Sequence, residues 1–307
     1  MIGIVILNYI NWNDTKLCIE SIFENEKKLK YHIYVVDNNS PVKCPIDLSL
    51  ILNDVSITLL KASKNRGYSA GNNIGINKAI NDGCQEILLT NNDVLFKDNS
   101  IYELYKFLRG NELVGIVGPK IYLTNGKIQM INMGIKTGLK EKYMYLLRKT
   151  IFYPFVKTFI NKFCALEQDL SKPFEVHSVS GCCFMMSENC AKEITPLDEN
   201  TFLYQEELII GFKMEEVGYK TMYVPNSEVI HAHGQTTSQI KAFSYTCLVE
   251  SELYYFKRYL KSTAVTLFPL YIIRTTKYLG MSIKYKDFRT NLMDYFKGTI
   301  QKLLQKY

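Results

Sequence analysis

The N-terminal third of the chain alternates between short, wholly apolar runs and amphipathic segments. Apolar runs without polar interruption are typical of parallel strands buried on both faces, and helical periodicity between them is typical of crossover connections. Strands are expected at residues 2–7, 32–36, 56–60, 86–90 and 114–117, and helices after Asn13-Asp14, over 71–81 and over 98–109. This alternation predicts right-handed β-α-β units and an α/β fold with a mostly parallel sheet flanked by helices.

The middle of the chain is less regular, and its last part is mainly helical and amphipathic. A strand is expected at 176–180, and a helix over 205–217 that ends at Gly218. Pro225-Asn226 is a turn signal between two short strands. The segment 136–165 is aromatic and basic and is interpreted as an insertion. We expect one large domain with halves at 1–117 and 118–238, followed by a helical tail at 239–307.

The composition is that of a globular protein, with 47% hydrophobic and 22% charged residues. The net charge of +7 is unevenly placed, because residues 236–307 carry twelve Lys/Arg and four Asp/Glu. A near-neutral body with a basic tail is not typical of nucleic-acid-binding proteins, so no nucleic-acid partner is expected.

No secretory signal is visible, and no apolar stretch reaches the roughly 18–20 residues of a membrane-spanning helix. The eight cysteines lack zinc-type spacing. We interpret them as buried, reduced thiols of a cytoplasmic protein.

Polar residues follow three of the expected strands, where ligands of parallel sheets collect. These are Asn8-Tyr9, Asp37-Asn38 and Asn91-Asn92-Asp93. A carboxylate such as Asp93 can bind Mg²⁺ or Mn²⁺, which bridges to diphosphate oxygens and neutralises charge on a departing nucleotide diphosphate. The alternative is that Asp93 caps a helix or forms a turn.

A glycine-rich loop runs from Lys64 to Gly75. Gly67 and Gly71 permit tight backbone geometry, and a helix that starts near Gly71 would offer free N–H groups to an anion. Arg66 could add a charge-assisted contact to phosphate. The loop does not fit the dinucleotide fingerprint that follows a first strand, and it could also be a simple turn.

Two further clusters carry chemistry. Glu206-Glu207 opens a helix, where a carboxylate can either interact favourably with the helix dipole or serve as a general base. His231-Ala-His233 follows a strand, and its two imidazoles would point the same way in an extended chain. The pair is either a metal-binding element or a surface strand end.

The order of these motifs along the chain is more specific evidence of a protein family than any one motif alone. The succession includes Val35-Val-Asp-Asn-Asn-Ser40, Asn65-Arg-Gly-Tyr-Ser-Ala-Gly-Asn-Asn-Ile-Gly75, Leu89-Thr-Asn-Asn-Asp-Val94, Ser180-Gly-Cys-Cys-Phe184, Phe202-Leu-Tyr-Gln-Glu-Glu207 and Val229-Ile-His-Ala-His-Gly234. From about residue 2 to 238 the chain resembles the family 2 glycosyltransferases of GT-A fold, especially the rhamnosyltransferase-like branch that builds bacterial surface polysaccharides.

The resemblance implies a nucleotide-sugar-binding half at 1–117, an acceptor-binding and catalytic half at 118–238, and inversion of configuration by single displacement. The implied nucleotide-binding residues are Asn8, Tyr9, Asp37, Asn38, Arg66, Gly71, Asn72, Asn92 and Asp93. The implied metal ligands for Mg²⁺ or Mn²⁺ are Asp93, Asn91 in the first acidic position of the DxD-type motif, and His231, with His233 as second choice.

The family's Glu-Asp pair falls on Glu206-Glu207. Glu207 is therefore the candidate base, one methylene longer than the usual Asp, and Glu206 could share its role. The donor would be a UDP, dTDP or GDP sugar and the acceptor a glycan or a lipid-linked molecule. A sugar-phosphate nucleotidyltransferase and a non-catalytic binding protein on a decayed transferase scaffold are the alternatives; the first lacks the Gly-rich loop expected directly after its first strand.

The tail could contact a membrane. Its apolar residues Leu253, Phe256, Leu260 and Leu267 recur at near-helical spacing, interleaved with Lys257, Arg258 and Lys261. A basic amphipathic helix of this kind suits an anionic bilayer at the inner face of the cell membrane, where a lipid-linked acceptor would reside. The alternative is a helix packed on the body with a solvated basic face.

Overall fold

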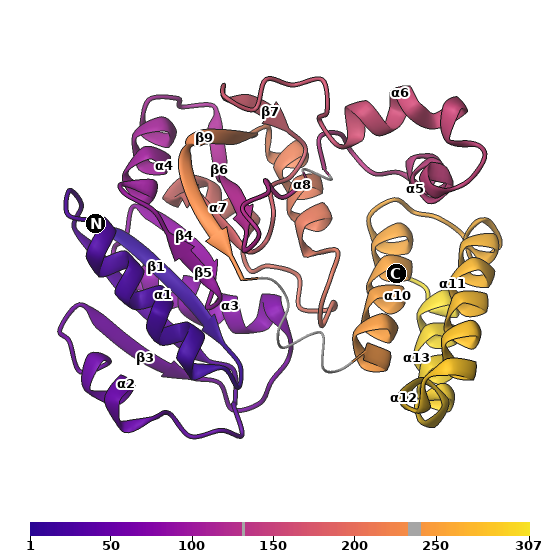
Figure 1. Cartoon of the computed structure of the whole chain (residues 1–307), viewed down its shortest axis with the longest axis horizontal. Coiled ribbons are helices and arrows are strands. Elements are labelled where there is room, and N and C mark those ends of the chain that lie inside the picture. The colour runs from indigo at the N-terminus through magenta and orange to yellow at the C-terminus, as the bar shows by residue number, and fades with distance from the viewer. Residues whose placement is uncertain (131–132, 233–240) are drawn as a thin grey trace.

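The computed structural model describes residues 1–130, 133–232 and 241–307, and these residues form a nine-stranded sheet covered by helices on both faces, with a helical layer beside it (Figure 1). The strands are β1 (Ile2–Asn8), β2 (Tyr31–Asp37), β3 (Ile57–Lys61), β4 (Glu86–Asn91), β5 (Val94–Phe96), β6 (Val114–Leu123), β7 (Phe174–Val176), β8 (Cys183–Ser187) and β9 (Lys220–His231). The helices of the body are α1 (Trp12–Asn25), α2 (Ile46–Ile51), α3 (Tyr68–Asn81), α4 (Ser100–Arg109), α7 (Glu188–Ile194) and α8 (Glu206–Val217).

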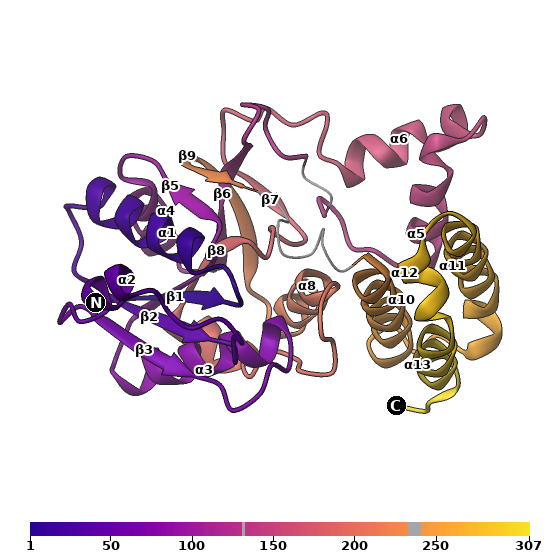
Figure 2. The ribbon, with the colours of Figure 1, turned by 60° about the horizontal axis from the view of Figure 1, so that its bottom comes forward.

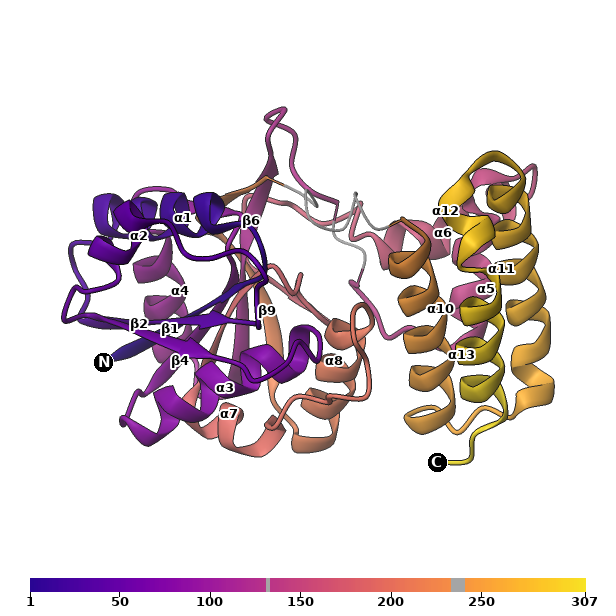
Figure 3. The same cartoon turned by 90° about the horizontal axis from the view of Figure 1, so that it is seen from below.

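The N-terminal half of the sheet is parallel, as predicted. β1 pairs with β2 and β4, and β2 pairs with β3, all in parallel register. The alternating side chains of β1 separate two cores: Ile4 and Ile6 pack with α1 and α4, while Val5 packs with α3 and α7. Helices therefore cover both faces (Figure 3), and the carboxyl ends of β1, β2 and β4 meet at one edge.

The C-terminal half of the sheet is mixed, which the strand–helix alternation did not predict. β8 lies between β4 and β6 and is antiparallel to both, while β9 is parallel to β6. The chain enters β8 from the carboxyl end of β4, so it must run back along that strand. The predicted strand at 176–180 is wrong, because only Phe174–Val176 is extended into β7 and residues 177–182 are irregular.

The predicted turn at Pro225-Asn226 is also wrong. β9 is continuous from Lys220 to His231, and its pairing with β6 shifts register so that Val224 faces Pro119 and Glu228 faces Lys120. The extra residues form a bulge, which absorbs a proline that cannot donate to the ladder. The predicted boundary between residues 117 and 118 falls inside β6, so the two halves share a strand.

The remaining helices form a separate layer, seen at the right of Figure 2. They are α5 (Leu139–Leu146), the 3₁₀ turn η1 (Leu147–Lys149), α6 (Tyr153–Phe163), α10 (Lys241–Arg258), α11 (Ala264–Lys284), α12 (Lys286–Thr290) and α13 (Leu292–Leu304). Leu253, Phe256 and Leu267 lie in the core of this layer. The apolar face predicted to meet a membrane is thus packed inside the protein.

A buried ion pair links three of these helices. Arg274 of α11 donates two hydrogen bonds of 2.7 and 2.8 Å to Glu252 of α10, and Lys142 of α5 approaches the same carboxylate at 2.5 Å. The insertion and the tail are therefore one packed unit. In the described parts of the chain, every helix falls short of the length and apolarity needed to cross a membrane. All eight cysteines are free, and all but the partly exposed Cys44 are buried.

Candidate active site

Asp93 and His231 lie side by side because their strands pair. β5 runs antiparallel to β9 with Val94 opposite His231, and the N–H of Ala232 donates to the carbonyl of Asp93 at 2.9 Å. This pairing places Nε2 of His231 3.3 Å from Oδ1 of Asp93. Burial acts to lower the pKa of His231, but hydrogen bonds to Asp93 and Cys182 outweigh it and raise the pKa to about 10. His233 lies outside the described residues.

The residues at this position fit a divalent cation only in part. One carboxylate and one imidazole converge, and Asn91 ends β4 two residues before Asp93 in the chain. No group of three His, Cys, Asp or Glu side chains in residues 1–130, 133–232 and 241–307 is arranged to hold a metal ion. Mg²⁺ and Mn²⁺ usually keep several non-protein oxygen ligands, so this donor set fits an ion that is shared with a diphosphate.

Asn92 and Asn8 tie the ends of β4 and β1 together. The side-chain amide of Asn92 donates to Oδ1 of Asn8 at 3.1 Å, to the carbonyl of Asn11 at 2.8 Å and to Oγ1 of Thr15 at 3.1 Å. Nδ2 of Asn8 is buried and has no hydrogen-bonding partner in residues 1–130, 133–232 and 241–307. These contacts hold Asp93 in place. Contact of Asn8, Tyr9 or Asn92 with a nucleotide stays a prediction.

The glycine-rich loop begins its helix earlier than predicted. α3 starts at Tyr68, and the N–H of Gly71 already donates to the carbonyl of Gly67. Gly71 therefore offers no free N–H to an anion; its lack of a side chain instead admits Leu7 and Asn38. Asn72 is buried and donates to the carbonyl of Tyr68 at 3.1 Å.

Position 67 of this loop requires a glycine. Its φ is +93°, and a Cβ atom there would lie 2.1 Å from the carbonyl oxygen of Phe202, which accepts a hydrogen bond from Tyr68. Asn38 supports the loop by donating to Oδ1 of Asn65 and to the carbonyl of Gly67, each at 3.1 Å. Gly67 thus lets the loop and the segment before α8 pack together.

The remaining predicted nucleotide ligands lie at the same edge. Asp37 ends β2, and its Oδ1 accepts the N–H of Ser40 at 2.9 Å. Arg66 is half exposed and forms an ion pair of 2.7 Å with Glu199. An anion bound beside Arg66 would compete with Glu199, which sequence reasoning did not single out.

Glu206 and Glu207 begin α8 after two residues in the left-handed region, Tyr204 (φ 72°) and Gln205 (φ 68°). Such backbone strain is often found at functional sites. Burial and the adjacent charge of Glu207 raise the pKa of Glu206 well above its ordinary value, and its buried Oε2 has no hydrogen-bonding partner among the described residues. Burial also raises the pKa of Glu207, opposed by N–H groups of its own residue and of Gly181.

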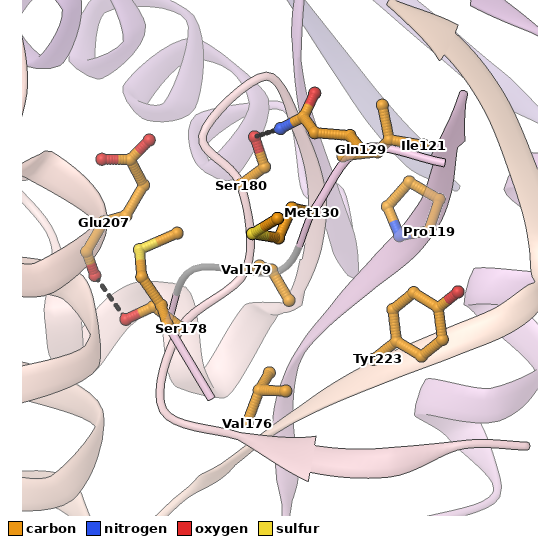
Figure 4. Close-up of a pocket in the computed structure, with 11 residues that line it drawn as sticks. Pro119, Ile121, Gln129, Met130, Val176, Ser178, Val179, Ser180, Glu207 and Tyr223 are labelled. Atoms are coloured by element: carbon orange, nitrogen blue, oxygen red, sulfur yellow. Dashed lines mark hydrogen bonds between the residues drawn. The ribbon is translucent and has the colours of Figure 1, made fainter. Parts of the chain in front are cut away.

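Glu207 faces a cavity of about 180 Å³ (Figure 4). Figure 4 shows Glu207 and Ser178 on one side of this cavity and Pro119, Ile121 and Tyr223 on the other. Oγ of Ser178 donates to the carbonyl of Glu207 at 2.7 Å, which fixes the start of α8. The lining also includes Gln129, Met130, Met133, Val176, Val179 and Ser180.

The segment Ser180-Gly181-Cys182 contacts Glu207, the glycine-rich loop and the end of β4. The N–H of Gly181 donates to Oε1 of Glu207 at 3.2 Å, and its carbonyl accepts from the hydroxyl of Tyr68 at 2.5 Å. The carbonyl of Cys182 accepts the N–H of Asn91 at 2.8 Å. The expected base, donor loop and metal motif are thereby joined through one short backbone segment.

Gln129 completes the connection. Its Nε2 donates to Oγ of Ser180 at 3.3 Å, and its Oε1 lies 3.3 Å from Nδ1 of His231. A lone glutamine after a short hairpin carries no sequence signal, so sequence reasoning missed it together with Ser178. The result is a chain of contacts from Asp93 through His231 and Gln129 to Ser180, whose neighbour Gly181 contacts Glu207.

A mixed sheet flanked by helices, with the residues predicted for donor, metal and base at one edge, has the architecture of the GT-A glycosyltransferase fold. Residues 3–195 match glycosyl transferase family 2, and the chain belongs to this family. Over 242 residues it is 24% identical to the low-salt glycan biosynthesis hexosyltransferase Agl10 of Haloferax volcanii, covering 78% of this chain and 69% of that protein.

Another relative matches over a shorter stretch. The chain is 29% identical over 77 residues to the N-acetylglucosaminyl-diphospho-decaprenol L-rhamnosyltransferase of Mycobacterium tuberculosis, and this match spans 24% of the chain and 25% of that relative. Among solved structures, GalNAc-T7 with UDP, GalNAc and Mn²⁺ has a TM-score of 0.55 and 17% identity over 75% of this chain and 43% of its own. Staphylococcus aureus TarS 1–349 has a TM-score of 0.52 and 10% identity over 83% and 72%. The predicted family and fold are confirmed.

Proposed function

We propose that this protein is an active inverting glycosyltransferase that moves a sugar from a nucleotide-diphosphate sugar to a glycan or lipid-linked acceptor. The observation that carries this proposal is the contact chain through Ser180-Gly181-Cys182. It holds the carboxylate of Glu207 beside an open cavity while connecting it to Tyr68 of the donor loop and to Asn91 at the metal motif. This connection supports the proposal because displacement at one carbon depends on the alignment of base and donor.

Glu207 is assigned as the base in the proposed reaction. The acceptor hydroxyl attacks the anomeric carbon, a new C–O bond forms, and the bond to the diphosphate oxygen breaks. The hydroxyl proton passes to Glu207, and the leaving electron pair stays on the diphosphate. Glu207 suits this role because it lines the cavity and accepts the N–H of Gly181, whereas burial and the charge of Glu207 raise the pKa of Glu206 well above its ordinary value.

Asp93, His231 and Asn91 are assigned to hold Mg²⁺ or Mn²⁺ together with the donor. The ion would supply charge neutralisation for the leaving diphosphate. Asp93 contributes its carboxylate, His231 contributes its imidazole once it has released the proton that its raised pKa favours, and Asn91 adds an amide oxygen in place of a second carboxylate. The proposed nucleotide pocket is formed by the ends of β1 and β2 and by Arg66. The halves 1–117 and 118–238 keep their proposed donor and acceptor roles.

The cavity is assigned to the acceptor. Met133 lines it and also packs against the core of the helical layer, so the acceptor side of the site lies next to that layer. The mycobacterial relative's name specifies a diphospho-decaprenol acceptor. A comparable lipid-linked acceptor, in surface polysaccharide synthesis at the cytoplasmic face of a bacterial membrane, is the substrate we propose here.

A second candidate function is non-catalytic binding of a nucleotide sugar. It is favoured by Asn91, which leaves the metal motif with one carboxylate, and by the lack of a three-ligand cluster in the described parts of the chain. A donor screen separates the two functions. UDP, dTDP and GDP sugars are incubated with the protein, Mn²⁺ and lipid extract, and release of nucleotide diphosphate is measured. Release from one donor class supports the transferase; binding of a donor without release supports the second function.

A further inference from the structure

α11 carries an exposed apolar stripe along its whole length. Val265 (83% exposed), Phe268 (53%), Ile272 (43%), Leu279 (39%) and Ile283 (80%) are spaced three, four, seven and four residues apart, which places them on one face of a helix. The opposite face packs into the core through residues that include Leu267, Leu270, Tyr271 and Tyr278. A helix of 21 residues extends about 30 Å, so the stripe is long.

A second apolar patch lies at the start of α6. Ile151 (86% exposed), Phe152 (50%) and Phe155 (84%) are large apolar side chains in solvent. α6 packs on α5, where Phe163 and Tyr145 have ring centroids 4.8 Å apart. The hydroxyl of Tyr143 on α5 donates in turn to the carbonyl of Thr266 on α11. The patch and the stripe therefore lie on helices of one packed layer, and Figures 1 and 3 show these helices beside the sheet.

The sequence around both features is basic and lacks acids. Residues 253–286 contain seven Lys/Arg and no Asp or Glu, and residues 142–166 contain five Lys/Arg and no Asp or Glu. Arg274, which points inward, is neutralised by Glu252. The cations that remain exposed in these segments include Lys149, Lys157, Lys261, Lys277, Lys284 and Lys286. The outer surface is consequently both apolar and positively charged.

We propose that the α11 stripe, together with the Ile151–Phe155 patch, docks the protein on an anionic lipid surface. Apolar side chains flanked by lysines and free of carboxylates are the composition that inserts at the boundary between headgroups and acyl chains. A second copy of the chain fits this surface poorly, because a symmetric contact would bring the same lysines together. The docking face differs from the Leu253–Leu267 face predicted from the sequence. The docking proposal does not depend on the proposed catalysis.

The test is sedimentation of the full chain with vesicles of phosphatidylglycerol or of phosphatidylcholine. The wild type is expected to sediment with phosphatidylglycerol vesicles and to remain in solution with phosphatidylcholine. Phe268→Ser/Ile283→Ser is expected to lose at least about tenfold in vesicle affinity, because it removes two of the stripe's apolar groups. The matched control is Val55→Ser, an apolar residue of the body that is 96% exposed and should bind as the wild type does.

Circular dichroism verifies that the double variant is folded, and Phe155→Ser provides a second variant outside α11. The proposal is overturned if Phe268→Ser/Ile283→Ser and Phe155→Ser both sediment with the vesicles as the wild type does. Failure of the wild type to bind phosphatidylglycerol vesicles also overturns it. Concentration-dependent dimerisation in the absence of lipid, lost in Phe268→Ser/Ile283→Ser, would assign the surface to a second copy instead. None of these readouts depends on turnover, so they are unaffected if no donor is found.

Discussion

The backbone N–H of Gly181 donates a hydrogen bond of 3.2 Å to Oε1 of Glu207. This bond fixes one oxygen of the carboxylate in a residue that lines the cavity. Burial shifts the pKa of Glu207 upward and the N–H of Gly181 opposes that shift, so the group is kept ionisable in a buried position. A base that must be both buried and charged needs such a donor.

The pH dependence of turnover should report this carboxylate. The pKa of Glu207 is raised above its ordinary 4.5, and the base acts only when it is unprotonated. kcat/KM should therefore rise with pH along a limb whose midpoint lies above 4.5, and become flat once Glu207 is ionised. A pH–rate profile measures the midpoint, with circular dichroism at each pH to verify folding. A limb centred at or below 4.5 would contradict the assignment.

Loss of Asp93 should uncouple metal from nucleotide. In Asp93→Asn the carboxylate that faces His231 is removed with little change of shape, so Mn²⁺ should no longer tighten binding of the nucleoside diphosphate. Calorimetric titration with and without Mn²⁺ measures the coupling, expected to be on the order of tenfold or more in the wild type. Asp98→Asn, near the start of α4, serves as control. Equal coupling in Asp93→Asn and wild type would remove Asp93 from the metal site.

Gly67→Ala should destabilise the protein more than an alanine at another left-handed glycine. The new Cβ would meet the carbonyl of Phe202 at 2.1 Å, whereas nothing lies within 4 Å of a Cβ at Gly83, which has a φ of +75°. Gly83→Ala should cost about 1 kcal/mol from the backbone alone, and Gly67→Ala about 3 kcal/mol or more. Urea denaturation of both variants measures the difference in unfolding free energy. Similar losses in the two variants would mean that the glycine-rich loop and the segment containing Phe202 separate easily.

Glu26 should make stability depend on pH. It is buried, and it accepts the N–H of Ile101 at 2.5 Å at the start of α4. Burial raises its pKa from 4.5 to about 7, against the effect of these N–H donors. Its stabilising contribution is therefore complete below pH 4.5 and declines as pH rises towards 7. Glu26→Gln should remove this decline, so the difference in unfolding free energy between wild type and variant should change across that range. A pH-independent difference would show that Glu26 does not titrate there.

The sequence was sufficient for the parallel half of the sheet and for the strand-end residues, because buried apolar runs and the polar groups after them are local signals. It was insufficient for the contact between Asp93 and His231, which depends on β5, a strand of three residues whose pairing with β9 has no local signature. Gln129 and Ser178 depend on tertiary packing in the same way.

The tail shows a different reason for error. Leu253, Phe256 and Leu267 have helical periodicity, but the first two lie on α10 and Leu267 lies on α11, which carries apolar residues on two faces. Periodicity predicts a helix and its apolar faces without deciding which face is packed and which is exposed. The packing of α10, α11 and α13 determines which face is buried, and the stripe from Val265 to Ile283 remains exposed to solvent.

The most direct test of the proposed reaction compares Glu207→Gln with Glu206→Gln under the same donor, acceptor and Mn²⁺. Glu207→Gln keeps the shape but cannot take a proton, so transfer should fall by about 10²–10⁴-fold. Glu206→Gln resembles the protonated acid that burial favours, so transfer should stay within about tenfold of the wild type. Near-normal turnover in Glu207→Gln, or the larger loss in Glu206→Gln, would contradict the assignment of Glu207 as the base.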